Sequence, residues 1–143
     1  MKDDKVFLDT NIIVYAYDTS AGEKHEKAVK IMEGLWDSGH GIISSQVLQE
    51  FFVNVTRKIA NPLDVITAKE IVKDFLKWKI VIIDGEIILE AIDIYSKYKY
   101  SFWDSMIIAS AIEGGARAIL SEDLSDMQLI KGLTIKNPFL KLL

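Results

Sequence analysis

The stretch Lys5-Val6-Phe7-Leu8-Asp9-Thr10-Asn11 decides how the rest of the chain is interpreted. Its apolar run, from Val6 to Leu8, predicts a short buried strand, and Asp9 follows directly after it. In open parallel sheets, ligands bind in the crevice beyond the carboxyl ends of the strands. We therefore expect Asp9 at the mouth of such a crevice, although aspartate at this position is also a preferred helix N-cap.

Outward from this stretch, short β-rich runs alternate with longer segments of helical periodicity. Helices are predicted at residues 10–17, 23–38, 46–59, 64–78, 85–98 and 101–113. Further strands are predicted at 42–43, 80–83, 118–120 and 133–135. Crossovers of this length form right-handed βαβ units, which predicts a three-layer α/β domain with a parallel five-stranded sheet. We expect residues 1–143 to form this single domain.

The composition narrows the class of protein. Half of the 143 residues are hydrophobic and 27% are charged, which is typical of a globular chain. The net charge of −4 argues against binding of nucleic acid by the whole surface. The lack of cysteine excludes a disulfide framework and a thiolate metal site. Because no segment approaches the roughly 20 apolar residues of a membrane span, we expect a cytoplasmic protein.

The predicted strands and helices indicate positions for three more carboxylates. Asp123 comes after the fourth strand, and it would face the same crevice as Asp9 if the strand order reverses between the first and fourth strands. Asp104 shares one helix face with Ile107 and Ile108, and a lone buried carboxylate is costly unless it is paired or binds a metal. Glu50 lies away from the apolar stripe of its helix, so periodicity alone places it in solvent.

The carboxylates also have purely structural interpretations. Asp9 could serve only as a helix cap, and Asp104 could favour the helix dipole as an acid in the first turn. Glu122, Asp123 and Asp126 could form a solvated acidic loop. The pattern of separated carboxylates at element ends is therefore more informative than any one of them.

Four segments of the chain carry a family resemblance. They are Phe7-Leu8-Asp9-Thr10-Asn11-Ile12, Ser44-Ser45-Gln46-Val47-Leu48-Gln49-Glu50-Phe51, Phe102-Trp103-Asp104-Ser105-Met106-Ile107 and Leu120-Ser121-Glu122-Asp123-Leu124. In this order they resemble the PIN domain family, and within it the VapC-like toxins of toxin–antitoxin pairs. The resemblance implies a sheet ordered 3-2-1-4-5 and a metal-dependent endoribonuclease that hydrolyses RNA phosphodiester bonds. It also implies an acidic quartet of Asp9, Glu50, Asp104 and Asp123, which moves Glu50 into the site.

Such a quartet selects the class of metal. Carboxylates in a chain without cysteine and with only two histidines favour hard cations, so Mg²⁺ or Mn²⁺ is expected rather than zinc. Crowded carboxylates raise one another's pKa, and a divalent ion relieves that repulsion. We expect the three aspartates to hold one or two ions, with Glu50 as a ligand or as the residue that orients the attacking water. The residues predicted to support them are Thr10, Asn11, Ser121 and Asp126.

RNA contacts are predicted on the Glu50 side of its helix, from Asn54, Arg57 and Lys58, although solvated helix-end cations are an equal interpretation. Phe102 and Trp103 could stack on a base, but aromatic residues at a helix start usually pack inside, so we predict both in the core. The resemblance implies a small antitoxin protein as partner. The surplus of apolar residues is also consistent with a homodimer.

Two other functional classes stay open. A phosphotransfer or phosphatase-like α/β domain would use Asp9 as nucleophile, but it usually needs a second acid two residues later, where this chain has Asn11. A non-catalytic PIN-like interaction module would instead receive a partner's arginine in the acidic pocket.

Overall fold

The structure, a computed structural model, describes residues 4–140, so residues 1–3 and 141–143 of the predicted domain lie outside it. Its centre is one sheet in the order β3-β2-β1-β4-β6-β5. The strands are β1 (Val6–Leu8), β2 (Gly41–Ser44), β3 (Lys79–Val81), β4 (Ala118–Leu120), β5 (Leu129–Ile130) and β6 (Leu133–Lys136). All are parallel to their neighbours except β5, which is antiparallel to β6.

The predicted parallel sheet is confirmed, with β6 as its fifth strand, and β5 is an addition at its edge. The run predicted as the last strand is the second arm of a β-hairpin. Its turn contains Lys131 at φ 50° and Gly132 at φ 85°. A two-residue hairpin turn of this kind requires positive φ at both central positions, which glycine adopts without strain.

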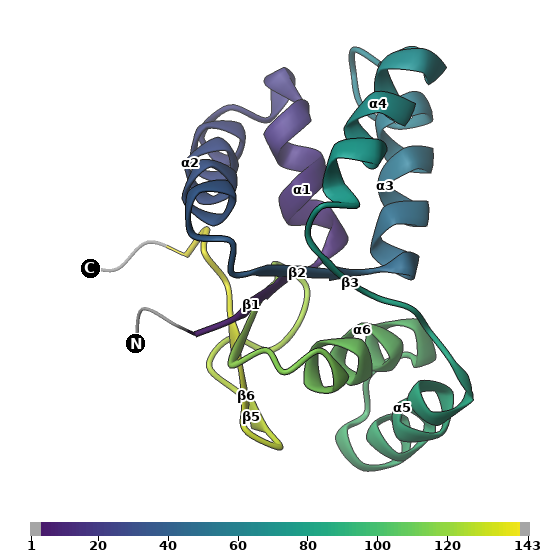
Figure 1. Cartoon of the computed structure of the whole chain (residues 1–143). Helices are drawn as coiled ribbons and strands as arrows, with labels where there is room; N and C mark the ends of the chain where they lie inside the picture. Colours follow the sequence, from purple (N-terminus) through teal and green to yellow (C-terminus); the bar gives the residue numbers. More distant parts are fainter. Residues whose placement is uncertain (1–3, 141–143) are drawn as a thin grey trace.

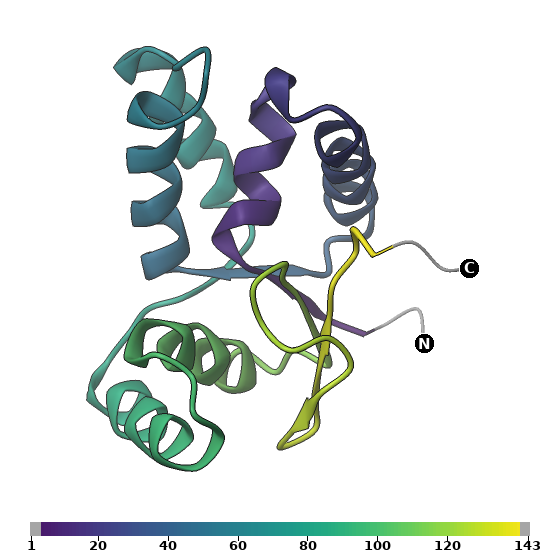
Figure 2. The ribbon, with the colours of Figure 1, turned by 180° about the vertical axis from the view of Figure 1, so that it is seen from behind.

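Helices cover both faces of the sheet, as Figures 1 and 2 show. The helices α1 to α4 pack on one face, and α5 and α6 pack on the opposite face. Their bounds are α1 (Thr10–Tyr17), α2 (Glu23–Ser38), α3 (Ser45–Arg57), α4 (Val65–Phe75), α5 (Gly85–Tyr98) and α6 (Phe102–Glu113), with a 3-10 turn at Thr19–Ala21. In the part of the chain that the structure describes, no helix combines the length and apolar character needed to cross a membrane.

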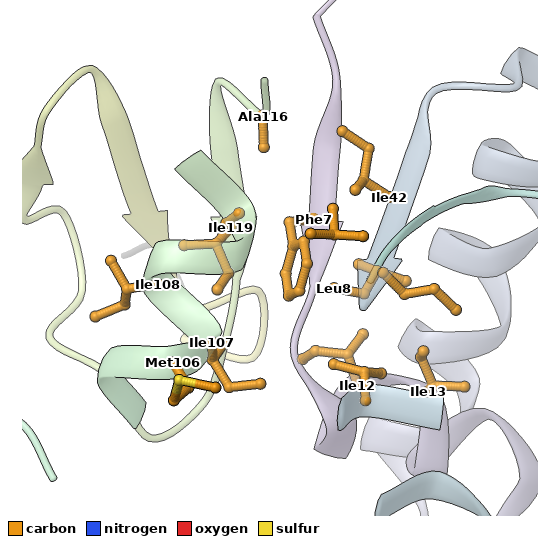
Figure 3. Close-up of a cluster of buried hydrophobic side chains, with 14 of the residues drawn as sticks. Phe7, Leu8, Ile12, Ile13, Ile42, Met106, Ile107, Ile108, Ala116 and Ile119 are labelled. Atoms are coloured by element: carbon orange, nitrogen blue, oxygen red, sulfur yellow. The ribbon is translucent and has the colours of Figure 1, made fainter. Parts of the chain in front are cut away.

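The core lies on both sides of β1, which explains why its apolar run is continuous rather than alternating. Phe7 and Leu8 have no exposed surface. Figure 3 shows Met106, Ile107 and Ile108 of α6 on one side of this strand and Ile12 and Ile13 of α1 on the other. Residues 105–111 of α6 are all buried, as expected of a helix that is enclosed on every side.

Polar caps start the helices at the carboxyl ends of two central strands. The Asp9 carboxylate accepts a hydrogen bond from Thr10 N at 2.7 Å, which caps α1 after β1. Ser44 Oγ accepts one from Val47 N at 3.2 Å, which caps α3 after β2. Both turns therefore bring polar side chains to the same edge of the sheet.

Several predicted boundaries differ from the structure. The third strand spans Lys79–Val81 rather than residues 80–83, and Ile82 is 68% exposed because the chain has already left the sheet there. The helix predicted at 64–78 begins after its cap, Asp64, and ends at Phe75. The end of β3 lies on the same carboxyl edge of the sheet as the ends of β1 and β2, but Ile82 and Ile83 are absent from the lining described for the site pocket.

Candidate active site

The carboxylates of Asp9, Glu50, Asp104 and Asp123 line one pocket of about 450 Å³. Asp9 and Asp123 follow the adjacent strands β1 and β4, which meet at the point where the strand order reverses. Glu50 comes from α3 on one face of the sheet, and Asp104 comes from α6 on the other. The pocket therefore lies in the crevice that the sequence predicted for Asp9.

Asp9 is held by hydrogen bonds to both of its carboxylate oxygens. Oδ1 accepts from Thr10 N at 2.7 Å, and Oδ2 accepts from the hydroxyl of the buried Ser121 at 2.8 Å. Burial, with smaller contributions from the nearby Asp104 and Glu50, raises the pKa of Asp9 to about 6 in spite of these two bonds. Asp9 is thus both the helix cap and a carboxylate whose negative charge is disfavoured.

Glu50 faces the pocket because two polar side chains orient it. Thr10 Oγ1, in a residue only 4% exposed, donates to Glu50 Oε1 at 2.5 Å. Gln46 Nε2, one helical turn earlier on α3, donates to Glu50 Oε2 at 3.2 Å. Periodicity placed Glu50 in solvent because it lies away from the apolar stripe of α3. Its position depends on Thr10, which lies on another helix, and the spacing of residues along α3 does not reveal that contact.

Asp104 and Asp123 complete the acidic lining. Ser101 Oγ accepts from Asp104 N at 3.1 Å, so Asp104 lies in the capped first turn of α6. Partial burial raises its pKa, the bond from Ser101 opposes the rise, and Asp123 and Glu50 add to it. Asp123 is exposed at the pocket rim, where its Oδ2 accepts from Asn11 Nδ2 at 3.0 Å.

The four carboxylates carry like charges, but in this structure their oxygens do not surround a single point at which an ion could bind. Within residues 4–140, no three Asp, Glu or His side chains are gathered closely enough to hold one ion together. Mg²⁺ keeps several of its waters and needs only one or two direct carboxylate ligands, so the oxygen-only donor set still fits it. Burial, and to a smaller extent the neighbouring carboxylates, raise the pKa of Asp9 and of Asp104, and a bound cation would favour the charged form of both.

Three of the four predicted supporting residues contact the carboxylates, namely Thr10, Asn11 and Ser121. The fourth, Asp126, is absent from the pocket lining among the described residues. Its Oδ1 accepts from Asn137 N at 2.8 Å, so it fastens the loop after β4 to the chain after β6.

Two of the three residues predicted to contact RNA line the pocket, and the third is not in its described lining. Asn54 and Lys58 line the pocket, but Arg57, which is exposed on α3, is not among the described lining residues. Helical spacing does not explain this difference, because position seven after Glu50 returns closer to its direction than positions four and eight. Lys58 is instead the C-cap of α3, where the helix ends. Separate substitutions of Lys58 and Arg57 can therefore distinguish their roles in RNA binding.

The prediction that Trp103 belongs to the core is wrong. Its side chain is 64% exposed and lines the pocket, while Phe102 packs against the core as predicted. Consecutive residues on a helix point about 100° apart, and in the first turn of α6 the direction of Trp103 leads to the pocket, whereas that of Phe102 leads to the core. Sequence reasoning also missed Gln46, Gln49, Val53 and Ile107 as lining residues.

Tyr100 connects the segments that carry Asp104 and Asp123. It lies just before α6, and its hydroxyl accepts from Ser125 N at 3.1 Å and donates to Gln128 Oε1 at 2.5 Å. Both partners belong to the loop that follows Asp123. The loop is thereby tied to the start of α6.

A family model described as the PIN domain matches residues 6–128. Comparison with curated protein sequences found no match. Among solved structures, the fold is similar to that of a toxin–antitoxin complex from Klebsiella pneumoniae, at 18% identity, 94% coverage of this chain, 98% of that chain and a TM-score of 0.68. It is also similar to DNA-bound VapBC from Salmonella typhimurium, with the same identity and coverages and a TM-score of 0.65. A third similar structure is VapC20 from Mycobacterium tuberculosis, a sarcin-ricin loop cleaving toxin, at 17% identity, 83% and 92% coverage and a TM-score of 0.63.

Proposed function

Because this chain belongs to the PIN domain family, we propose that it is a Mg²⁺- or Mn²⁺-dependent endoribonuclease and the toxin of a toxin–antitoxin pair. The observation that carries the proposal is the convergence of four carboxylates on one pocket. In the part of the chain that the structure describes, none of the four forms an ion pair with a basic side chain. A pocket that gathers four carboxylates, with Lys58 as the one basic residue in its described lining, fits a divalent ion and a phosphate substrate.

The residues of the pocket would have different roles in hydrolysis. Asp9, Asp104 and Asp123 would hold the metal, with Asp9 fixed by Thr10 and Ser121. When bound, the ion would supply a Lewis acid that lowers the pKa of water and offsets charge on the phosphate. Glu50 is oriented to take a proton from the attacking water.

The reaction forms a bond from the water oxygen to phosphorus and breaks the bond from phosphorus to the 3′ oxygen, which gains a proton. The products are then a 5′-phosphate and a 3′-hydroxyl. Lys58 and Asn54, at the α3 side of the pocket, would contact the phosphates. The route differs from that of a paired-histidine ribonuclease, which passes through a 2′,3′-cyclic phosphate.

A cleavage assay tests the proposal directly. Total RNA is incubated with the protein in Mg²⁺, in Mn²⁺ and in EDTA, and the ends of the fragments are mapped. We expect cleavage only with metal and 5′-phosphate ends. Undiminished cleavage in EDTA or by the Asp9→Asn variant would contradict the mechanism. A thermal shift supplies a readout besides activity, because Mn²⁺ should raise the Tm of the wild-type protein more than that of Asp9→Asn.

An antitoxin is the proposed protein partner. An apolar groove of about 530 Å³ runs between α3 and α4, lined in part by Leu48, Phe52 and Val72. It shares Gln49 and Val53 with the carboxylate pocket, so a peptide lying in the groove would reach the pocket. Co-expression with the protein encoded by the neighbouring reading frame, followed by co-purification, tests the pairing. Release of the partner should restore cleavage.

A homodimer in the cytoplasm is the proposed state of the free protein. The outer face of α5 exposes large apolar side chains, among them Ile88, Leu89 and Ile92. Exposed apolar residues gathered on one helix often form an interface. Analytical ultracentrifugation of the wild-type protein and of Leu89→Glu tests this arrangement, and a monomeric wild-type protein would contradict it.

The phosphotransfer alternative receives less support. Both oxygens of Asp9 already accept hydrogen bonds, and Asn11, at the position where a second acid is usual, binds Asp123. Failure to trap a phosphorylated Asp9 is the result we expect.

A further inference from the structure

Trp103 is exposed at a position where the adjacent residue, Phe102, is packed inside. The indole is 64% exposed, and its ring meets that of Phe102 edge-on at a centroid distance of 5.2 Å and an angle of 74°. Single exposed apolar residues are common and need no explanation by themselves. Trp103 differs from the others because it lines the carboxylate pocket and directly precedes Asp104.

The backbone of Trp103 is held in place. It lies in the first turn of α6, which Ser101 caps, and its carbonyl oxygen accepts from Gln46 Nε2 at 3.4 Å. The ring is therefore carried by a fixed helical turn and braced by Phe102. An aromatic surface that is rigid before binding loses little conformational entropy when a ligand covers it.

Gln46 supplies an independent observation at the same place. Its side chain is only 7% exposed and lines the pocket. Both groups that Nε2 contacts, Glu50 Oε2 and Trp103 O, are acceptors, which fixes the orientation of the amide. Gln46 Oε1 is then buried without a hydrogen-bond donor among the described residues. A buried carbonyl without a donor is costly. Because less than 1 Å² of this oxygen is exposed, a donor on a bound nucleotide would reach it only if the Gln46 side chain turns toward the pocket.

We propose that Trp103 stacks on one base of a single-stranded RNA whose phosphodiester lies at the carboxylates, with Gln46 beside it; this proposal rests on the proposed ribonuclease function. Four carboxylates and a net charge of −4 repel a phosphate backbone, so electrostatic attraction alone gives weak binding. Stacking on a neutral indole adds affinity that salt does not screen. Every base has a π-face, so the contact is tolerant of sequence.

Fluorescence anisotropy with labelled rA10 and rU10 decamers tests the proposal. All proteins carry Asp9→Asn to prevent turnover, and Mn²⁺ is present. Trp103→Ala should weaken binding about 5- to 150-fold, the loss expected from removing one stacked base. Trp103→Phe should retain most of the affinity. Trp103→Leu should lose it, because leucine keeps apolar area but has no π-face.

Two controls separate stacking from other effects. Tyr95→Ala removes another exposed aromatic side chain, 54% exposed on α5, and should leave RNA binding unchanged. Trp103→Ala should shift binding equally at every salt concentration, because stacking releases no counterions. Lys58→Ala should instead lower the slope of log Kd against log salt by about one. Circular dichroism checks that each variant is folded.

The proposal is overturned if Trp103→Ala binds like Tyr95→Ala, if Trp103→Leu binds like Trp103→Phe, or if the starting protein binds neither decamer. It is also overturned if Trp103→Ala loses a protein partner but keeps RNA affinity. Failure of the ribonuclease function is seen separately, as absence of metal-dependent cleavage by the protein without Asp9→Asn. If Trp103→Ala shows metal-dependent cleavage with an unchanged KM, the stacking proposal fails and the ribonuclease function stands.

Discussion

Glu122 and Asp123 are neighbours in the chain, but Glu122 is paired with a lysine, whereas Asp123 lies in a pocket lined by other carboxylates. Glu122 turns toward α1 and α2, where it accepts a hydrogen bond from Tyr15 Oη at 2.6 Å and pairs with Lys24. Partial burial opposes its ionisation, yet the bonds from Lys24 and Tyr15 outweigh burial and lower its pKa. Asp123 turns into the carboxylate pocket, where its contact is the amide of Asn11.

The contrast identifies which acids are structural. A carboxylate that has a cation and a hydroxyl beside it stabilises the fold in its charged form. In the pocket, burial and like charges raise the pKa of Asp9 and Asp104, so the metal-free protein holds those charges at a cost. Such a cost at a cleft is typical of a functional site, and here it points to a cation supplied from solution.

The largest expected difference between the two regions is in catalysis. Asp9→Asn should lower kcat for RNA cleavage by roughly 10²-fold or more, a loss typical of removing a group that stabilises the transition state. Glu122→Gln removes a negative charge from the same vicinity and should leave kcat close to that of the wild-type protein. Initial rates at saturating RNA in Mn²⁺ measure both. Equal losses of kcat in the two variants would show that catalysis does not depend specifically on the carboxylates of the pocket.

The same substitution should stabilise the metal-free protein. The pKa of Asp9 in the folded state is about 6, above its ordinary value of 3.8, so the unfolded chain binds fewer protons between these values. The charged carboxylate thus opposes folding above pH 6, by up to about 3 kcal/mol, and this cost disappears as pH falls toward 4.

Urea denaturation of wild type and Asp9→Asn in EDTA measures this effect. We expect the variant to be more stable at pH 7.5 and the two proteins to converge near pH 4. A variant that is less stable at pH 7.5 would mean that the hydrogen bonds of Asp9 outweigh its desolvation.

A smaller effect is expected from the residue that orients Glu50. Thr10→Val removes the hydroxyl that donates to Glu50 Oε1 but keeps the shape of the side chain, and kcat should fall about 10- to 100-fold, as for other groups that orient metal ligands. Thr56→Val is the matched control, because Thr56 Oγ1 donates to Phe52 O on the same helix. If both variants retain wild-type kcat, Glu50 does not depend on Thr10 for its position.

The smallest expected effect is the loss of the Glu122 contacts. The pKa of Glu122 is lowered in the folded protein, so its contribution to stability is present above its ordinary pKa of 4.5 and is lost as pH falls through the folded value. Glu122→Gln should therefore destabilise the protein at pH 7 by up to about 1 kcal/mol, since Lys24 is largely in solvent. Denaturation at pH 7 and pH 4 measures the difference, which should be smaller at pH 4.

Much of the fold could be predicted from the sequence because local signals agreed with the tertiary structure. The apolar run before Asp9 marks the end of a strand and Asp9 marks a helix cap, and both are where they were predicted. The β5–β6 hairpin was missed because a two-residue strand such as Leu129–Ile130 has no measurable periodicity. Its turn depends on backbone conformation at Lys131 that is rare for lysine.

The site was less predictable than the fold. Periodicity along α3 could not place Glu50, because the contact that orients it comes from Thr10, forty residues earlier in the chain. Trp103 was assigned to the core because composition cannot tell which of two adjacent aromatic residues faces inward. In both cases the missing information is long-range packing, which a single helix does not encode.

The two edges of the sheet are β3, of three residues, and β5, of two. Short edge strands offer few unpaired backbone groups to another molecule, which limits edge-to-edge association. The parallel core of the sheet would otherwise end at β6, a longer strand with an open side. The hairpin that sequence reasoning overlooked therefore replaces the open side of a four-residue strand with a two-residue edge, which leaves fewer backbone groups for edge-to-edge association.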